Sequence, residues 1–183
     1  MPHALSDLEV RHLLNCVTNP IHKACLAIMY SCGLRVSEAV SLDVHAINRA
    51  NMVLKIVGKG DKERHVPLPL PMLRQLEDLW RSHRHPRWLF PNRDGSAHLA
   101  TSTLGSTFAR AVLAARMMGI ARPTTHSLRH SYATRLLENR VELRVVQCFL
   151  GHASMRTTAA YTHLTEPTRQ QVRSLLDSIM AGL

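Results

Sequence analysis

The sequence predicts a mainly α-helical fold with one small antiparallel β-sheet, which is an α+β class. Apolar side chains recur every three or four positions over most of the 183 residues, and this is the period of an α-helix. One segment, residues 51–68, alternates as a strand does. Because 45% of the residues are hydrophobic and no linker or repeat interrupts the chain, we expect a single domain over residues 1–183.

The N-terminal part of the chain is predicted to form three helices. Helical spacing covers residues 6–17 and 21–32, and Gly33 is suited to end the second of these helices. A third helix is expected to begin near Val36. The sequence therefore places a tight break between the second and third helices.

Residues 51–68 are predicted to form a β-hairpin. Met52, Leu54 and Ile56 alternate with the residues between them, and the glycine-rich segment 58–61 is a turn signal. A second short run follows over residues 64–68. Two strands joined by this turn would form the sheet of the fold.

Helical spacing returns after the hairpin and continues to the C-terminus. A loop rich in turn formers, residues 86–96, separates the first two of these helices. The last helix carries an apolar stripe that includes Val172, Leu176 and Ile179. The predicted helices span residues 70–83, 103–118, 126–138, 142–150 and 167–180.

The charge balance favours an anionic partner. Lys and Arg number 23 against 13 Asp and Glu, which gives a net charge of +10 with the 12 histidines neutral. Charge alone does not choose among DNA, RNA, anionic lipid and an acidic protein. No apolar run approaches the roughly 20 residues that span a bilayer, and the start of the chain lacks the pattern of a secretion signal. We therefore expect a cytoplasmic protein with no membrane partner.

The cysteines and histidines do not predict a metal site. Cys16, Cys25, Cys32 and Cys148 form no C-x-x-C pair, so reduced thiols in the core are expected. Two histidines four residues apart, at positions 126 and 130, lack the glutamate of the H-E-x-x-H motif. We expect no metal and no other cofactor.

Residues 124–137 are the most informative segment. On a helical wheel His126, Arg129 and Tyr132 share one half with the leucines, whereas Ser127 and Ser131 lie on the other half. A buried cation is costly unless an anion meets it, so Arg129 requires an acidic partner or an anionic ligand.

The same helix has an N-terminus that could bind an anion. If Thr125 caps it, its first turn offers free N–H groups to a phosphate. The alternative is a structural Arg–Glu pair beside a histidine that is already hydrogen-bonded.

Four further residues are candidates on weaker local grounds. Arg35 lies where one helix ends and the next begins, and Lys59 lies between two glycines at the hairpin tip. His152 follows Gly151, a second helix stop, and Tyr161 lies nine residues beyond His152. Taken singly, these residues equally fit a surface arginine, an ordinary turn, a loop histidine and a core aromatic side chain.

Together these segments resemble the catalytic domain of the tyrosine recombinases, the phage integrase family. The resemblance extends from about Leu5 to the C-terminal helix. Its motifs occur in the family's order and spacing, which makes the set far more specific than any one of them. They are G-L-R-V-S-E around Arg35, G-K-G-D-K-E-R around Lys59, H-S-L-R-H around His126 and Arg129, L-G-H-A-S around His152 and Y-T-H around Tyr161.

The resemblance implies roles for the basic residues. Arg35 and Arg129 would hold the non-bridging oxygens of the scissile phosphate. His126 and His152 would add hydrogen bonds, and His126 could also move a proton. Lys59 would be the general acid that protonates the departing 5′ oxygen.

The resemblance also implies a nucleophile and an acidic helper. Tyr161 would attack the phosphate and form a 3′-phosphotyrosyl intermediate. Its phenol, with an ordinary pKa of about 10, would be activated by the positive pocket. Glu38 would orient the site. No metal is needed, because the arginines and the lysine would stabilise the charge, and no ATP is needed, because a phosphodiester is exchanged for a phosphotyrosine of similar energy.

The partners implied are double-stranded DNA and further copies of the chain. In the family four protomers assemble on two DNA sites, and the C-terminal helix, residues 166–183, packs on its own domain or on a neighbouring subunit. Accessory DNA-bending proteins and association with the nucleoid also fit this expectation. Full-length relatives carry an N-terminal helical core-binding domain, which we do not find here, so the chain is expected to be a fragment or a naturally short member.

Two alternative functions remain open from the sequence. A type IB topoisomerase uses a similar tyrosine and similar basic residues but only relaxes supercoils. A non-catalytic DNA-binding regulator could keep the same fold without turnover. The short chain and the H-x-x-R motif favour the site-specific recombinase, an enzyme that transfers DNA strands.

Overall fold

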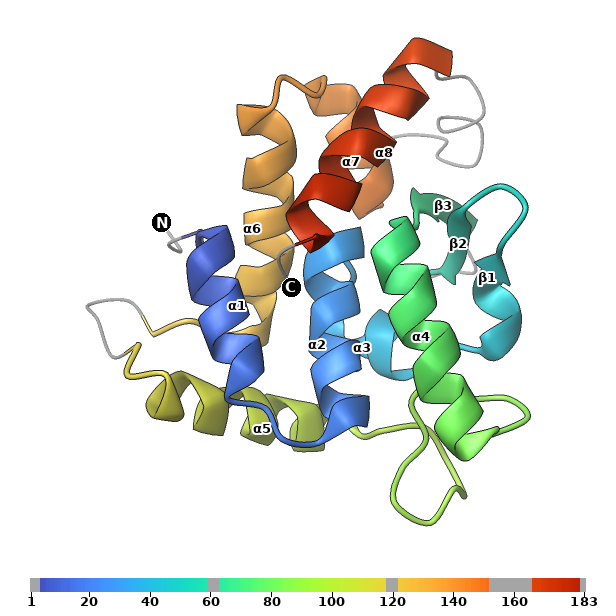
Figure 1. Cartoon of the computed structure of the whole chain (residues 1–183), viewed down its shortest axis with the longest axis vertical. Coiled ribbons are helices and arrows are strands. Elements are labelled where there is room, and N and C mark those ends of the chain that lie inside the picture. The colour runs from blue at the N-terminus through green and yellow to red at the C-terminus, as the bar shows by residue number, and fades with distance from the viewer. Residues whose placement is uncertain (1–3, 59–62, 118–121, 152–165, 182–183) are drawn as a thin grey trace.

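The computed structural model describes residues 4–58, 63–117, 122–151 and 166–181. Helices dominate, and one small sheet lies at the edge of the molecule, near α4 (Figure 1). In chain order the elements are α1 (Asp7–Asn15), α2 (Pro20–Cys32), α3 (Val36–Val40), the 3-10 turn η1 (Val44–Ala46), β1 (Ile47–Asn48), β2 (Val53–Val57), β3 (Glu63–Pro67), α4 (Leu70–His83), α5 (Thr101–Ala114), α6 (Thr125–Glu138), α7 (Leu143–Leu150) and α8 (Glu166–Met180). The predicted fold class is confirmed.

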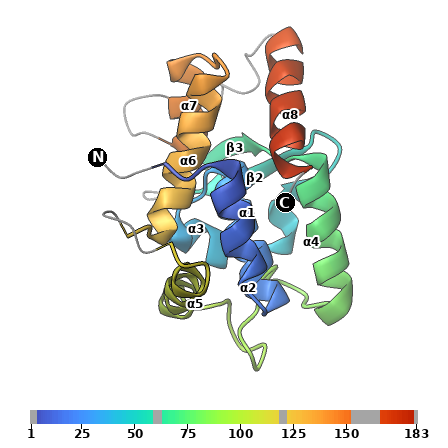
Figure 2. The same ribbon diagram turned by 60° about the vertical axis from the view of Figure 1, so that its left-hand side comes forward.

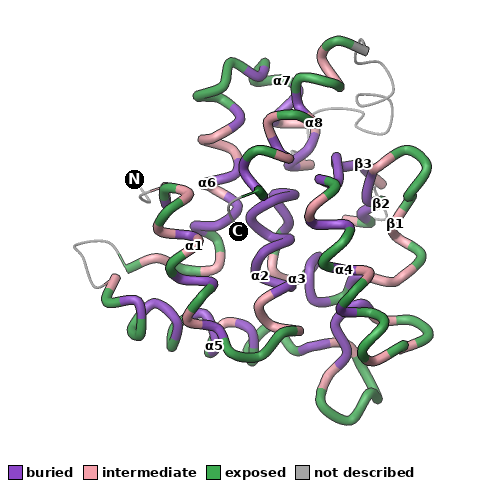
Figure 3. The backbone as a smooth tube through the Cα atoms, viewed as in Figure 1, coloured by how far each residue is buried: buried purple, intermediate pink, exposed green. Residues whose placement is uncertain are grey.

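Helix α2 is the centre of the fold. Every residue from position 24 to position 32 is buried, so no face of this part of the helix is left to solvent. α6 and α4 pack on opposite sides of α2, and α1, α3, α5 and α8 also contact it (Figures 1 and 2). The burial pattern follows this arrangement: the polar faces of the outer helices point outward, while α2 is enclosed (Figure 3).

The sheet is antiparallel and has the strand order β1-β2-β3. β2 and β3 form the predicted hairpin, in which Leu54 pairs with Val66 and Ile56 pairs with Arg64. The short strand β1 was not predicted. It has only two residues, too few for an alternating pattern to be recognised, and it is held by pairing with β2.

Most helix ends agree with the predicted boundaries to within a few residues. α1 begins with a capping box, in which the Ser6 hydroxyl accepts from the Glu9 backbone N–H and the Glu9 carboxylate accepts from the Ser6 backbone N–H. α5 runs from Thr101 to Ala114, not over residues 103–118. None of the helices in the part of the chain that the structure describes is long and apolar enough to span a membrane.

Helix α8 packs against the body of its own chain. Val172, Leu176 and Met180 are buried, as the apolar stripe predicted. The helix contacts α4 and α2, and the Asp177 carboxylate accepts a hydrogen bond of 2.9 Å from the backbone N–H of Leu70 at the start of α4. The apolar face of α8 is therefore covered within one protomer.

Candidate active site

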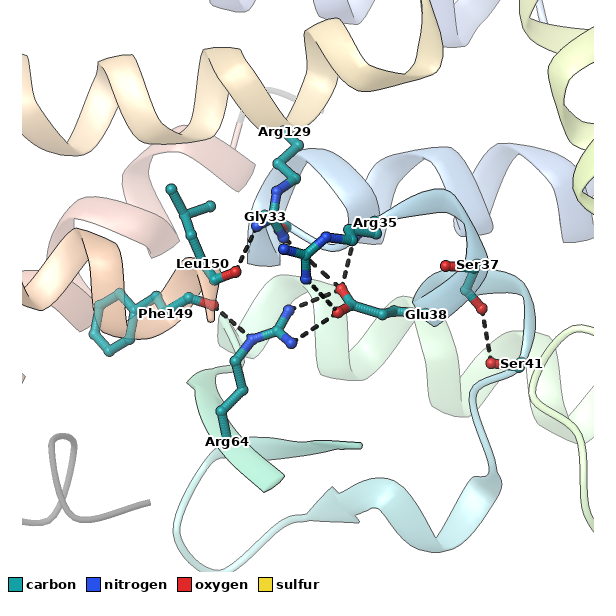
Figure 4. A network of polar contacts seen from close by, with 9 residues as sticks. All are labelled: Gly33, Arg35, Ser37, Glu38, Ser41, Arg64, Arg129, Phe149 and Leu150. Carbon is teal, nitrogen blue, oxygen red and sulfur yellow. Dashed lines mark hydrogen bonds and ion pairs between the residues drawn. The ribbon is translucent and has the colours of Figure 1, made fainter. Parts of the chain in front are cut away.

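Four charged side chains from separate parts of the chain meet beside the N-terminal end of α3. Arg35 and Glu38 come from the start of α3, Arg64 from β3 and Arg129 from α6 (Figure 4). One carboxylate lies among three guanidinium groups. We call these four residues the arginine cluster.

The break between α2 and α3 sets the position of Arg35. Gly33 ends α2 with a φ of 64°, and Arg35 is the N-cap residue of α3 with an extended backbone. The Arg35 backbone N–H and its Nη1 donate to the two carboxylate oxygens of Glu38, at 2.8 and 3.0 Å. The Arg35 side chain remains 44% exposed, so it is held at one end and open to solvent at the other.

Glu38 is the anionic centre of the cluster. Its side chain is only 6% exposed, and Nη1 and Nη2 of Arg64 donate one hydrogen bond of 2.8 Å to each of its oxygens. Burial raises the pKa of Glu38, but the hydrogen bonds and charge of Arg64, together with those of Arg35, outweigh burial and lower the pKa to about 2. Glu38 is therefore a carboxylate at neutral pH.

Arg129 is buried, as its wheel position predicted, and its guanidinium is held by the ends of two helices. Nη1 donates to the Gly33 carbonyl at 2.7 Å, and Nη2 donates to the Leu150 carbonyl at the end of α7. The nearest oxygen of Glu38 lies 3.8 Å away. Burial and the charge of Arg35 lower the pKa of Arg129 to about 10, so it stays protonated at neutral pH.

Of the two partners that the sequence offered for a buried Arg129, the structure contains the acidic one. Glu38 supplies an anion nearby, but at 3.8 Å it is a looser partner to Arg129 than to Arg64. The backbone carbonyls fix the orientation of the guanidinium without cancelling its charge. An anionic ligand could therefore still gain from it.

Sequence reasoning missed Arg64 as a member of the site. The residue is 3% exposed, and besides Glu38 it binds the Phe149 carbonyl through Nε at 2.8 Å. A signal for it was present. In a strand Arg64 falls in phase with Val66 and Leu68, which are both buried, so alternation alone puts this arginine on the inner face of the sheet.

Three details of the α6 prediction are wrong. His126 is exposed, Ser127 and Ser131 are buried, and Leu137 is 44% exposed. The wheel assumed one buried face, whereas α6 is covered by both α2 and α7. The buried hydroxyls are satisfied locally: Ser131 Oγ donates to the Ser127 carbonyl and accepts from the Leu5 backbone N–H.

The helix cap is also one residue earlier than predicted. Thr124, not Thr125, is the N-cap, and its backbone N–H donates to Ser127 Oγ at 3.0 Å. His126 is consequently the second residue of the helix. It lies on the same helix as Arg129, almost one turn before it, on the solvent-exposed first turn.

Lys59, His152 and Tyr161 lie outside the residues that the structure describes. The described chain stops on one side of His152 at Gly151, which ends α7 with a φ of 66°. Of the six predicted catalytic residues, the structure therefore brings Arg35 and Arg129 together around Glu38 and places His126 on the Arg129 helix.

The charges of the arginine cluster suit an anion. Three guanidinium groups and one carboxylate leave a net charge of +2, and Arg35 gives this charge an opening to solvent. The single carboxylate already accepts from Arg64 and Arg35, so the cluster offers a cation no free ligand. A phosphate group is the kind of ligand that such a cluster binds well.

Comparison with known proteins agrees with this geometry. The family model described as "Phage integrase family" matches residues 4–167. Tyrosine recombinase XerD of Pseudomonas putida is 36% identical, in an alignment that covers 95% of this chain and 61% of XerD. The chain belongs to the phage integrase family, whose members are the tyrosine recombinases.

Solved structures of recombinases share the fold. The crystal structure of XerA recombinase superposes with a TM-score of 0.75 at 27% identity, over 95% of this chain and 65% of XerA. XerH recombinase, bound to its difH substrate, gives 0.72 at 27% identity over 94% of this chain and 54% of XerH. The chain spans 53%, 65% and 61% of the length of three curated relatives that it matches.

Proposed function

We propose that this chain is the catalytic part of a site-specific DNA recombinase that cleaves and rejoins duplex DNA through a 3′-phosphotyrosyl intermediate. One observation carries the proposal: Arg35 and Arg129, far apart in the sequence, converge on Glu38 to form an anion site in a chain of this family. The described solved relative XerH is bound to a DNA substrate, which supports duplex DNA as the substrate here.

The arginines would act on the charge that develops during the reaction. A phosphodiester carries one negative charge, and attack by an oxygen adds a second in the transition state. The cluster's net charge of +2 matches the doubly charged transition state better than the singly charged phosphodiester. Because its donors are already oriented by carbonyls and by Glu38, little reorganisation is required as the charge grows.

The chemical step exchanges one P–O bond for another. The Tyr161 phenol gives its proton to His126 as its oxygen attacks phosphorus, the bond to the 5′ oxygen breaks, and Lys59 supplies the proton that the 5′ oxygen takes up. His126 and His152 donate hydrogen bonds to the phosphate oxygens. A 5′ hydroxyl of another strand then attacks the phosphotyrosine and releases the tyrosine, so the reaction requires no energy source.

Assembly follows from the need to exchange strands between two duplexes. Four protomers would bring two DNA sites together, with α8 moving from its place on α4 to a neighbouring subunit or remaining where it is. Accessory DNA-bending proteins would assist this assembly, and the protein would work at the nucleoid. Affinity for DNA should depend strongly on phosphate contacts and decrease with salt.

A suicide substrate tests the proposed function. The protein is incubated with a library of nicked duplexes, in which loss of a short fragment traps the covalent complex, and adducts are resolved on denaturing gels. The wild-type chain should form an adduct, and Tyr161→Phe should form none while retaining DNA, because only the nucleophilic oxygen is removed.

Tyr30→Phe is the matched control. It removes a hydroxyl that bonds Asp7 rather than one expected in the site, so its adduct should form as in the wild type. Absence of any wild-type adduct would favour a DNA-binding regulator. Efficient relaxation of plasmids of unrelated sequence would instead favour a type IB topoisomerase.

A further inference from the structure

Arg64 is the most enclosed of the three arginines in the cluster. Its side chain is 4% exposed, compared with 44% for Arg35. Nε binds the Phe149 carbonyl, and each Nη binds one oxygen of Glu38 (Figure 4). Contacts from β3 to two other elements, α3 and the end of α7, therefore fix this guanidinium in one orientation.

The chain closes over Arg64 at Gly151. A Cβ atom at Gly151 would lie 3.0 Å from Arg64 Cδ and 3.1 Å from Nη1. Close packing on this side, together with the bonds to Glu38 on the other, keeps the Arg64 side chain inside the protein. Within the part of the chain that the structure describes, the Arg64 side chain is 4% exposed, so we expect its effect on the reaction to pass through another residue.

Glu38 is the residue through which it would act. The carboxylate lies 3.0 Å from Arg35 Nη1 and 3.8 Å from Arg129 Nη1, close enough to compete with a phosphate for both. Arg64 donates one hydrogen bond to each carboxylate oxygen and supplies one full positive charge. The pair Arg64–Glu38 is then neutral, and the charges of Arg35 and Arg129 remain for an anion.

We propose that Arg64 is a positioning residue for DNA strand transfer: it neutralises and anchors Glu38, so that Arg35 and Arg129 stay oriented and charged toward the scissile phosphate. The inference rests on the proposed function and adds to it a residue whose side chain does not touch DNA. A purely structural arginine would instead affect the site only as far as it affects stability.

A double-mutant cycle tests the assignment. Arg64→Gln, Glu38→Gln and the double variant are compared with wild type for the rate of adduct formation at saturating nicked DNA, for affinity for an intact duplex and for thermal unfolding. Arg135→Gln is the matched control. It breaks another arginine–carboxylate pair, with Asp7, away from the cluster, and should lower stability without changing the adduct rate.

Arg64→Gln alone should slow adduct formation by at least about 10-fold and weaken duplex binding by at least about 3-fold, because a bare Glu38 then competes for both remaining arginines. In the Glu38→Gln background the same substitution should change either quantity by less than about 3-fold. Arg64→Lys, which keeps the charge, should recover part of the loss.

The pH dependence supplies a readout that stability alone would not move. Without Arg64 the pKa of Glu38 rises, so lowering the pH protonates Glu38 in the Arg64→Gln variant. The difference in adduct rate between Arg64→Gln and wild type should then become smaller. If Arg64→Gln lowers the adduct rate and the duplex affinity equally in the wild-type and Glu38→Gln backgrounds, or lowers them in neither, the assignment is overturned.

The two proposals can fail separately. If the wild type forms no adduct, the proposed strand transfer is contradicted. Duplex affinity in the same four proteins then decides the role of Arg64. The role is supported if Arg64→Gln weakens duplex binding in the wild-type background but not in the Glu38→Gln background. It is overturned if the substitution weakens binding equally in both backgrounds, or in neither.

Discussion

Gly33 links the backbone of the fold to the chemistry of the site. Its φ of 64° turns the chain from α2 into α3, and its carbonyl accepts the hydrogen bond from Arg129 Nη1. A Cβ atom there would lie 2.4 Å from Cδ1 of the Tyr132 ring, a distance that side chains do not tolerate. Because Gly33 has no side chain, α2 and α6 can pack closely at this point. The turn at Gly33 also sets the position of Arg35, two residues later.

Substituting Gly33 by alanine should destabilise the protein by more than about 1 kcal/mol, because both the positive φ and the clash with Tyr132 oppose a Cβ atom. Gly105→Ala is the control: it lies within α5, and no atom lies within 4 Å of the added Cβ. That change should stabilise by roughly 0.5–1 kcal/mol. Chemical denaturation measures both, and a Gly33→Ala protein as stable as wild type would refute the stated role of the turn.

At the scale of elements, the arginine cluster joins α3, β3, α6 and the end of α7. Arg64 and Arg129 bind the carbonyls of Phe149 and Leu150, the last two residues of α7, and both approach Glu38 at the start of α3. These elements are thereby connected through buried, paired charges as well as through apolar packing. Loss of one partner would leave the others buried without compensation.

Acid should weaken this connection. Since the pKa of Glu38 is lowered in the folded state, its charge stabilises the fold fully above the ordinary value of 4.5, and this stabilisation is lost as the pH falls toward about 2. Wild type should therefore exceed Glu38→Gln in free energy of unfolding near neutral pH, and the difference should shrink below pH 4.5.

Unfolding by denaturant across this range measures the difference. Glu138→Gln is the control, because that carboxylate is 56% exposed and pairs with Arg135 at the surface, where an ion pair contributes little. A difference between wild type and Glu38→Gln that stayed constant with pH would show that the charge of Glu38 does not connect these elements.

The elements themselves were largely predictable. Leu70–His83 was placed to the residue, and the hairpin was recognised, because local periodicity and turn residues determine both. The two faces of α6 were not, since Ser131 is covered by the segment before α1, whose Leu5 N–H it binds, and no local pattern reveals this neighbour. β1 likewise exists only through its pairing with β2.

The site was predictable in part. The helical pattern of one segment predicted that Arg129 is buried and requires an anion nearby. It did not predict which groups the arginine contacts. They are the Gly33 and Leu150 carbonyls, one of them 96 positions away in the sequence, and a Glu38 already taken by Arg64. The roles assigned to Lys59, His152 and Tyr161 remain predictions from the motifs.

For the whole molecule, the fold brings residues from both halves of the chain to one arginine cluster. Both α3 and α6 pack against α2, and the sheet adds Arg64 from a third direction (Figures 1 and 4). In the proposed function, this cluster holds a DNA phosphate while a tyrosine of the same chain attacks it. Its central element is therefore a covalent bond between DNA and one particular side chain.

Mass spectrometry of the trapped adduct tests that bond directly. After nuclease and protease digestion, the account predicts a nucleotide 3′-phosphate on the peptide that contains Tyr161, with the Tyr30 and Tyr132 peptides unmodified. A nucleotide found on another residue, or on none in protein that binds DNA, would contradict it.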